Sequence, residues 1–224
     1  MDVFQSVIDL DVKMLLFFNG MHNTYFDYFM SAYSGKWVWI PMYATILYVM
    51  LRNFSWKVAL GCALSVALVV LFADQVCDAL IRPYVERMRP ANLNNPLSEF
   101  VHIVDNHRGG RYGFPSCHAA NSFGLASFLL LLFRKRRLTV FMMAWALLTC
   151  YSRVYLGMHY PGDLLVGGFV GATGAWLVYR LFVKVSGYKR AEHVRYMDAP
   201  IWAGVLIILG MLLNAAIMTA ASAS

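Results

Sequence analysis

The sequence predicts an all-α fold, a polytopic membrane helical bundle of about six transmembrane helices with an N-terminal interfacial helix. Of the 224 residues, 60% are hydrophobic and only 14% are charged, which is too apolar for an ordinary soluble domain of this length. The lysines and arginines fall in short clusters between apolar runs, which favours membrane loops over a nucleic-acid surface. Because neither an internal repeat nor a second domain is visible, residues 1–224 are predicted to form a single membrane-embedded domain.

The N-terminal segment, residues 1–36, is predicted to lie along the membrane interface. Within the apolar run of residues 3–19, three charged side chains would make a full crossing costly: Asp9, Asp11 and Lys13. The aromatic residues that follow, as far as Trp37 and Trp39, suit the depth of the lipid headgroups. No basic start with an apolar core and a small-residue cleavage site opens the chain, so no removable signal peptide is predicted.

Six apolar runs are predicted to cross the membrane, for which a complete helix needs roughly 20 residues. They are residues 37–51, 58–81, 119–133, 138–155, 164–183 and 200–220. One long polar loop, residues 83–115, separates the second run from the third. Near the end of the second run, Asp74, Asp78 and Arg82 follow at four-residue steps. They are predicted to share one helix face, on which the aspartates neutralise Arg82 and nearby cations.

The basic clusters predict the orientation of the bundle if six helices alternate in direction. The cytoplasmic side would hold Arg52, Lys57, the RKRR turn at 134–137, Lys184, Lys189, Arg190 and Arg195. The polar motifs described next would all fall on the opposite, extracytoplasmic side. One membrane face would thus collect every candidate catalytic residue.

Three short motifs within residues 82–163 describe a phosphate pocket. They are Arg82-x6-Arg89-Pro90, then Pro115-Ser116-Cys117-His118, and finally Ser152-Arg153-x5-His159-x3-Asp163. The arginines of these motifs, Arg82, Arg89 and Arg153, offer planar groups of donors that stay charged and can hold the three free oxygens of a phosphate monoester. The same charges would stabilise the transition state of phosphoryl transfer.

Two histidines in these motifs can supply the remaining chemistry. The carboxylate of Asp163, four residues after His159, can fix the tautomer of the imidazole and leave its other nitrogen free to attack phosphorus. His159 is therefore the predicted nucleophile, oriented by Asp163. His118, at the start of an apolar helix, is the predicted general acid that protonates the departing lipid oxygen. The helix N-terminus at Ser116 and Cys117 would add backbone N–H donors for the phosphate.

The three motifs resemble, in order and in spacing, the signature motifs of the type-2 phosphatidic acid phosphatases. The resemblance implies a metal-independent membrane lipid phosphatase that works through a phosphohistidine and needs no cofactor. It implies the same roles for the two histidines, Asp163 and the arginines. The chain is most similar to bacterial members that act on undecaprenyl diphosphate or on lipid A phosphates, placed ahead of those that act on phosphatidylglycerol phosphate and phosphatidic acid. The oligomeric state is left open.

Two positions differ from the usual pattern of this family. Arg82 stands where lysine is more common, which keeps the charge but adds a bulkier, forked head group. Cys117 stands where glycine is usual, so its side chain would impose strain if the backbone there needs a positive φ or a close approach to phosphate. For a diphosphate substrate, Arg87, Arg108 and Arg111 could supply charge to the second phosphoryl group.

Other polar residues receive structural interpretations. Tyr155 and Tyr160 are ascribed to the aromatic belt of the membrane. His102, Asp105 and His107 are interpreted as part of a polar loop and not as a metal site, since no further ligand with suitable spacing follows. Two alternatives to a phosphatase stay open: a lipid phosphotransferase that uses the same phosphohistidine, and a non-enzymatic transporter with charges along a pathway. The first would need a second acceptor pocket, and the second would usually contain paired repeats.

Overall fold

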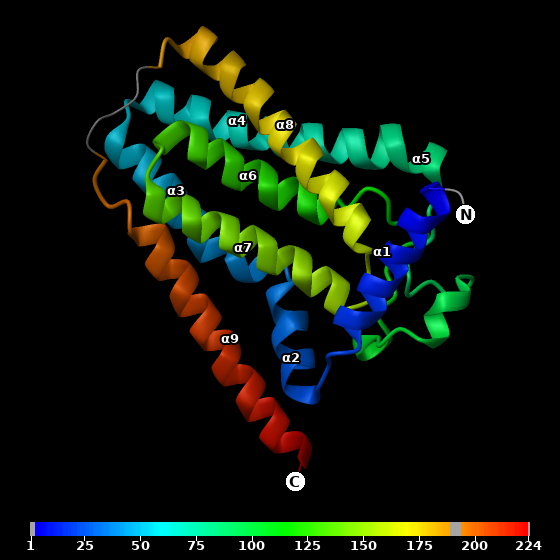
Figure 1. Ribbon diagram of the computed structural model, residues 1–224. Helices are drawn as coiled ribbons and strands as arrows, with labels where there is room; N and C mark the ends of the chain where they lie inside the picture. Colours follow the sequence, from blue (N-terminus) through cyan, green and yellow to red (C-terminus); the bar gives the residue numbers. More distant parts are fainter. Residues whose placement is uncertain (1–2, 189–193, 224) are drawn as a thin grey trace.

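The computed structural model describes residues 3–188 and 194–223, and within these residues the long helices lie side by side in one bundle (Figure 1). The α-helices are α1 (Val3–Asn19), α2 (Thr24–Tyr33), α3 (Ile40–Asn53), α4 (Trp56–Asp74), α5 (Arg82–Val85), α6 (Cys117–Phe133), α7 (Arg136–Tyr155), α8 (Pro161–Ser186) and α9 (Ala199–Ala223). The shorter elements are the π-helix η2 (Gln75–Ile81) and the 3₁₀ turns η1 (Trp37–Trp39), η3 (Pro96–Glu99) and η4 (Val104–Asn106). The predicted all-α class is confirmed.

Among the described residues, four helical stretches are long and apolar enough to cross a membrane: Trp56–Val85, Arg136–Tyr155, Pro161–Ser186 and Ala199–Ala223. The first joins α4, η2 and α5 into 30 residues. The other two predicted crossings correspond to α3, with 14 residues, and α6, with 17 residues, which are shorter than a complete span. The crossing of the membrane by six helices therefore stays a prediction.

The closest packing in the bundle is between α6 and α8. A Cβ atom added at Gly171 would overlap the backbone of Ala120, so only glycine allows the two helices to approach this closely. One consequence is that the starts of both helices are held together. The backbone N–H of Ser116 donates to the carbonyl oxygen of Asp163 at 3.0 Å, which joins the second sequence motif to the third.

The two ends of the bundle carry different kinds of residue, and Figure 1 shows which elements lie at each end. The starts of α6 and α8 lie at one end, together with α5, the polar loop of residues 83–115, and α1, which crosses this end obliquely. The end of α3, the start of α4, the α6–α7 turn and the end of α8 lie at the other end and carry the basic clusters. Lys189 and Arg190 lie outside the described residues. The motifs and the other basic clusters thus occupy opposite ends, as the sequence predicted.

The π-helix η2 changes the predicted arrangement of Asp74, Asp78 and Arg82. Its wider turns shift the register, so four-residue steps no longer place the three side chains on one face. Asp78 forms an ion pair with Arg82, which is the predicted neutralisation. Asp74 instead accepts a hydrogen bond from Nδ2 of Asn121 on α6 at 3.0 Å. Among the described residues Asp74 thus contacts Asn121 instead of Arg82, and its predicted neutralisation of nearby cations stays a prediction.

Candidate active site

The centre of the site is His159, which lies in the loop that joins α7 to α8. Asp163 is the third residue of α8, and this position turns its carboxylate back toward the loop. Its Oδ2 lies 3.3 Å from Nδ1 of His159 and accepts the backbone N–H of Tyr160 at 3.1 Å. Both side chains of the pair are 1% exposed. The structure thus brings the two residues together as their spacing predicts.

The contacts of His159 indicate which of its nitrogens carries the proton. Nη1 of Arg89 lies 2.9 Å from Nε2 of the imidazole. Because a guanidinium group can only donate, Nε2 is the acceptor, and the proton lies on Nδ1 facing Asp163. Burial, followed by the positive charges of Arg89 and Arg153, lowers the pKa of His159 well below its usual value. Both the contacts and the surrounding charges favour a neutral imidazole whose lone pair lies on Nε2.

Arg89 is held in place by the backbone of two loops. Its Nε donates to the carbonyl of Tyr112 at 3.2 Å, and its Nη1 donates to the carbonyl of Met158 at 3.1 Å. Burial, and then the charge of Arg82, lowers the pKa of Arg89 from that of a free guanidinium. An arginine stays charged through such a shift, so a fixed cation faces the lone pair of His159.

Arg82 connects the first motif to the second. Its Nη2 donates to the carbonyl of Pro115 at 3.1 Å and lies 3.2 Å from Sγ of Cys117. The Nε atom of Arg82 is buried without a hydrogen-bond partner among the described residues. A buried donor without a partner is costly, so Nε of Arg82 is a candidate donor to an anion.

The second motif starts α6 in the way that its sequence predicts. Ser116 is the N-cap, is 0% exposed, and accepts the backbone N–H of Ala119 at 3.4 Å. Cys117 is the first residue of the helix and is not among the described residues that have a positive φ. Strain from a positive φ is therefore excluded at Cys117, and an effect of its side chain on the approach of phosphate stays a prediction. Its thiol instead makes the contact with Arg82 that a glycine could not make.

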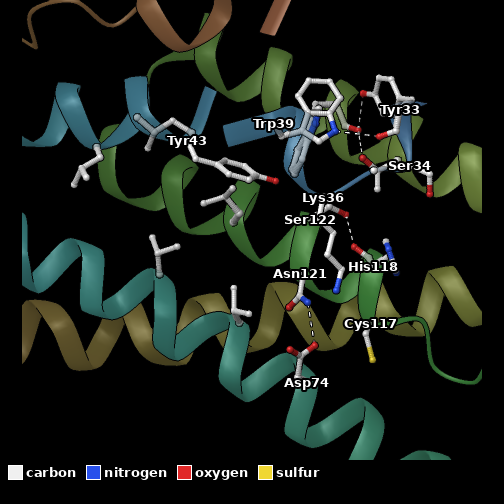
Figure 2. A pocket seen from close by; sticks show the side chains of 18 of the residues that line it. Tyr33, Ser34, Lys36, Trp39, Tyr43, Asp74, Cys117, His118, Asn121 and Ser122 are labelled. Atoms are coloured by element: carbon white, nitrogen blue, oxygen red, sulfur yellow. Dashed lines mark hydrogen bonds between the residues drawn. The ribbon is translucent and has the colours of Figure 1, made fainter. Parts of the chain in front are cut away.

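His118 and Arg153 complete the set of predicted residues. His118 lies in the first turn of α6 and lines a cavity of about 580 Å³, together with Lys36, Asp74 and Asn121 (Figure 2). Arg153, in the last turn of α7, is 8% exposed and donates from Nη1 to Oγ of Ser34. The positive charges of Arg153 and Lys36 favour the neutral form of the His118 imidazole until an anion enters the site. The three motifs thus meet at one end of the bundle.

The sequence did not indicate the contacts that Arg87, Asp11 and Lys36 make in the site. Arg87 donates to Oδ1 of Asp163 at 2.9 Å and is 2.7 Å from Oδ2 of Asp11 on α1. Two carboxylates thus already neutralise Arg87, which was considered as a ligand for a second phosphoryl group. Lys36 points into the cavity beside His118 (Figure 2). No motif spacing indicated these roles, since Asp11 and Lys36 lie far from the motifs in sequence.

Two tyrosines differ from their interpretation in the sequence. Tyr155 and Tyr160 are 1% and 4% exposed, so the prediction that they belong to an interfacial belt is wrong. Each hydroxyl is occupied in the interior, that of Tyr155 by Asp27 at 2.7 Å and that of Tyr160 by Asn95 at 2.9 Å. His102 also contacts Asp27, at 2.8 Å. These contacts attach α2 and the polar loop to the active-site end of the bundle.

A comparison with protein families agrees with this geometry. Residues 55–186, more than half of the chain, match the model of the PAP2 superfamily. The chain belongs to the PAP2 superfamily. The matched range contains all three motifs of this PAP2 protein and the helices from α4 to α8. It is accordingly a multi-pass membrane protein.

Similar proteins include two curated relatives and one solved structure. The chain is 48% identical to a lipid A 4′-phosphatase of Bacteroides thetaiotaomicron, over 92% of this chain and 95% of the relative. It is 30% identical to a lipid A 4′-phosphatase of Porphyromonas gingivalis, over 80% of this chain and 75% of the relative. The crystal structure of Aquifex aeolicus LpxE superposes with a TM-score of 0.57 at 20% identity, covering 76% of this chain and 95% of the other. That likeness concerns the fold.

Proposed function

We propose that this PAP2 protein is a lipid phosphatase that hydrolyses the 4′-phosphate of lipid A through a phosphohistidine, without a metal ion. The observation that carries the proposal is the position of His159, whose Nδ1 lies 3.3 Å from Asp163 and whose Nε2 lies 2.9 Å from Nη1 of Arg89. The two lipid A 4′-phosphatases that this chain resembles along most of its length support the choice of substrate.

In the first step, Nε2 of His159 attacks phosphorus, and the bond between phosphorus and the sugar oxygen breaks. His118 takes up a proton when the anionic phosphate binds beside it, and donates that proton to the oxygen as it leaves. Before the substrate binds, Arg89 donates to Nε2 of His159. When the phosphate enters, Arg89 must donate to the phosphate oxygens instead, which frees Nε2 for the attack. Arg82 and Arg153 would hold the remaining oxygens and spread the charge of the transition state.

In the second step, water attacks the phosphohistidine on the side from which the lipid has departed. His118, now without its proton, accepts a proton from this water, and the bond between Nε2 and phosphorus breaks. Inorganic phosphate leaves, and both histidines return to their starting states. Asp163 stabilises the positive charge that His159 carries while it is phosphorylated.

The cavity beside His118 supports a lipid as the substrate. Away from its polar end it is lined by apolar side chains from four helices, among them Ile46 on α3, Val66 on α4, Leu125 on α6 and Trp145 on α7. A volume of about 580 Å³ lies within the range of sites that bind small organic ligands. An acyl chain attached near the departing oxygen could enter this space. The polar part of the lipid would then lie near Lys36.

The charges near His159 favour a monophosphate over a diphosphate. A second phosphoryl group would need further cations, and Arg87, Arg108 and Arg111 were the candidates. Arg87 is paired with two carboxylates, and Nη1 of Arg108 donates to the carbonyl of Ala91 at 2.9 Å. Arg111 lies over the ring of Tyr112, with 5.1 Å between its Cζ and the ring centroid. Undecaprenyl diphosphate is therefore expected to be a poorer substrate than lipid A.

Phosphate release from a panel of purified lipids in detergent tests this function. Lipid A should be hydrolysed faster than four other substrates: undecaprenyl diphosphate, phosphatidylglycerol phosphate, phosphatidic acid and a water-soluble sugar phosphate. Of these substrates, only lipid A combines a monophosphate with an acylated diglucosamine whose acyl chains could enter the cavity. EDTA should leave the rate unchanged. Hydrolysis of the soluble ester at an equal rate, or loss of activity with EDTA, would contradict the proposal. Phosphate that appears on another lipid instead of in water would indicate a phosphotransferase.

The role of His118 can be tested through the leaving group. His118→Gln should slow hydrolysis of lipid A by about 10²- to 10⁴-fold, because an alkoxide leaves poorly without a proton. The same variant should lose much less activity on p-nitrophenyl phosphate, whose leaving group needs no proton. Wild-type protein supplies the reference ratio of the two rates. An equal loss on both substrates would contradict a general acid at this position.

The membrane arrangement that we propose has six crossings, with α3 and α6 added to the four long stretches and with α1 in the interface. One face of α1 supports this placement because its apolar residues are exposed at helical spacing: Val3, Val7, Leu10, Met14 and Phe17. The active-site end would face the periplasm, because the basic clusters at the opposite end favour the cytoplasm. The protein would lie in the bacterial inner membrane.

Reporter fusions test this orientation. A reporter near Lys189 is expected to be cytoplasmic, and one inserted near Asn95, in the polar loop, is expected to be periplasmic. The reason is the clustering of lysine and arginine at one end of the bundle. Detection of both reporters on the same side of the membrane would contradict the six crossings.

A further inference from the structure

The helix α1 contacts both helix ends that flank the catalytic loop. Its inner face presents Asp11, Leu15 and Asn19, which are spaced four residues apart. Leu15 is 0% exposed and Asn19 is 1% exposed, so this face is packed against the protein. The loop of residues 156–160, which contains His159, joins the end of α7 to the start of α8.

Asn19 holds the end of α7. Its Nδ2 donates to the carbonyl oxygens of Tyr155 at 2.7 Å and Val154 at 3.3 Å. These carbonyls belong to the last turn of α7, where a helix has no partners of its own for its acceptors. The side chain of Asn19 therefore ties α1 to the residues immediately before the catalytic loop.

Asp11 holds the start of α8. Its Oδ1 accepts the backbone N–H of Gly162 at 2.7 Å, which satisfies one of the free donors in the first turn of that helix. A Cβ atom at Gly162 would lie 2.8 Å from Oδ2 of Asp11, so glycine is needed for this approach. The two contacts of α1 therefore lie on either side of His159.

Asp11 also acts on the catalytic carboxylate through Arg87. The guanidinium of Arg87 lies between the two acids, 2.7 Å from Asp11 and 2.9 Å from Asp163. It is stacked over the ring of Tyr160, with 3.8 Å between its Cζ and the ring centroid. The side chains of Asp11, Arg87 and Asp163 are 12%, 24% and 1% exposed. At such sites an ion pair is screened less than on the surface, and its loss leaves charges that are only partly solvated.

We infer that Asp11 is a positioning residue of the active site, which holds Asp163 and the start of α8 in register with His159 through Arg87 and Gly162. The inference rests on the proposed function, because it takes His159 as the nucleophile. It assigns a role in the reaction to the N-terminal helix, which lies outside residues 55–186 that match the family. Without Asp11, Arg87 would have a single carboxylate partner and could turn away from the dyad.

A double-mutant cycle tests this coupling. Asp11→Asn is nearly isosteric and keeps an oxygen for the N–H of Gly162, but it removes the charge that faces Arg87. We expect it to lower kcat on lipid A by about tenfold with KM unchanged, and to have less than about a twofold effect when Arg87→Gln is already present. Asp9→Asn is the matched control, because Asp9 lies on the same helix and bonds Gln5 instead of the site. It should have less than about a twofold effect on kcat.

Binding of orthovanadate provides a measurement that does not depend on the lipid. Vanadate can adopt the five-coordinate geometry of phosphoryl transfer, so its affinity, measured by calorimetry in detergent, reports on the position of His159. Asp11→Asn should weaken this binding about tenfold, and less so beside Arg87→Gln. Strong vanadate binding without hydrolysis of lipid A would contradict the proposed substrate and leave the coupling measurable. Additive losses in the cycle, unaltered affinity in Asp11→Asn, or no binding of vanadate by the wild-type protein would overturn the inference.

Discussion

Replacing His159 with alanine is expected to lower phosphate release from lipid A by more than about 10³-fold. In the proposed mechanism Nε2 of this imidazole, which lies 2.9 Å from Nη1 of Arg89, attacks phosphorus. Without it, no phosphoenzyme can form. Acid-labile phosphate should appear on the wild-type protein when labelled substrate is quenched during turnover with base, because a phosphohistidine survives base but not acid. The same label should be absent from His159→Ala.

His107→Ala provides the matched control for this variant. His107 lies in the polar loop and is exposed, so its loss should change activity by less than about twofold. Because the side chain of His159 is buried, thermal unfolding of both variants must accompany the rate measurements. Full activity in a folded His159→Ala protein would exclude His159 as the nucleophile.

Asp163→Asn is expected to reduce kcat by about 10²- to 10⁴-fold. The carboxylate now accepts from Nδ1 of His159, from the backbone of Tyr160 and from Arg87. An amide can turn its N–H group toward Nδ1, which would place the proton on Nε2 and remove the nucleophilic lone pair. It would also leave Arg87 with Asp11 as its single carboxylate partner.

The effect should appear in kcat while KM changes little, because Asp163 does not contact the substrate in the proposed mechanism. Asp105→Asn, which alters an exposed carboxylate in the polar loop, is the control and should be as active as the wild-type protein. A loss in KM alone would mean that Asp163 binds the substrate and does not orient His159.

Much of the site could be predicted from the sequence because its chemistry is local. The four-residue step from His159 to Asp163 crosses a single helix start, and Pro161 marks that start by its fixed φ and missing N–H. Ser116 before α6 carries a comparable N-cap signal. Local spacing of this kind restricts the positions of side chains without any knowledge of the fold. The helix boundaries accordingly lie close to those predicted.

The turn geometry near Arg82 could not be predicted in this way. Apart from Gln75 and Asp78, Gln75–Ile81 continues the apolar run of the helix before it, and no glycine or proline within it indicates a π-helix. Its wider turns separate Asp74 from Asp78, so Asp74 lies toward the cavity while Asp78 pairs with Arg82. Such a local change in helical register leaves no pattern in the sequence.

The sequence by itself determined the membrane class, the order of the helices and the residues of the three motifs, because hydrophobic length and local spacing carry that information. The tertiary structure alone decided which distant groups support them. Asp11 and Gly162 are 151 residues apart, and Arg87 and Asp163 are 76 apart. An isolated aspartate in an apolar helix indicates only that its burial would be costly. Its partner depends on how the helices pack, because the charge is stabilised only where the fold brings a cation and a free N–H group to it.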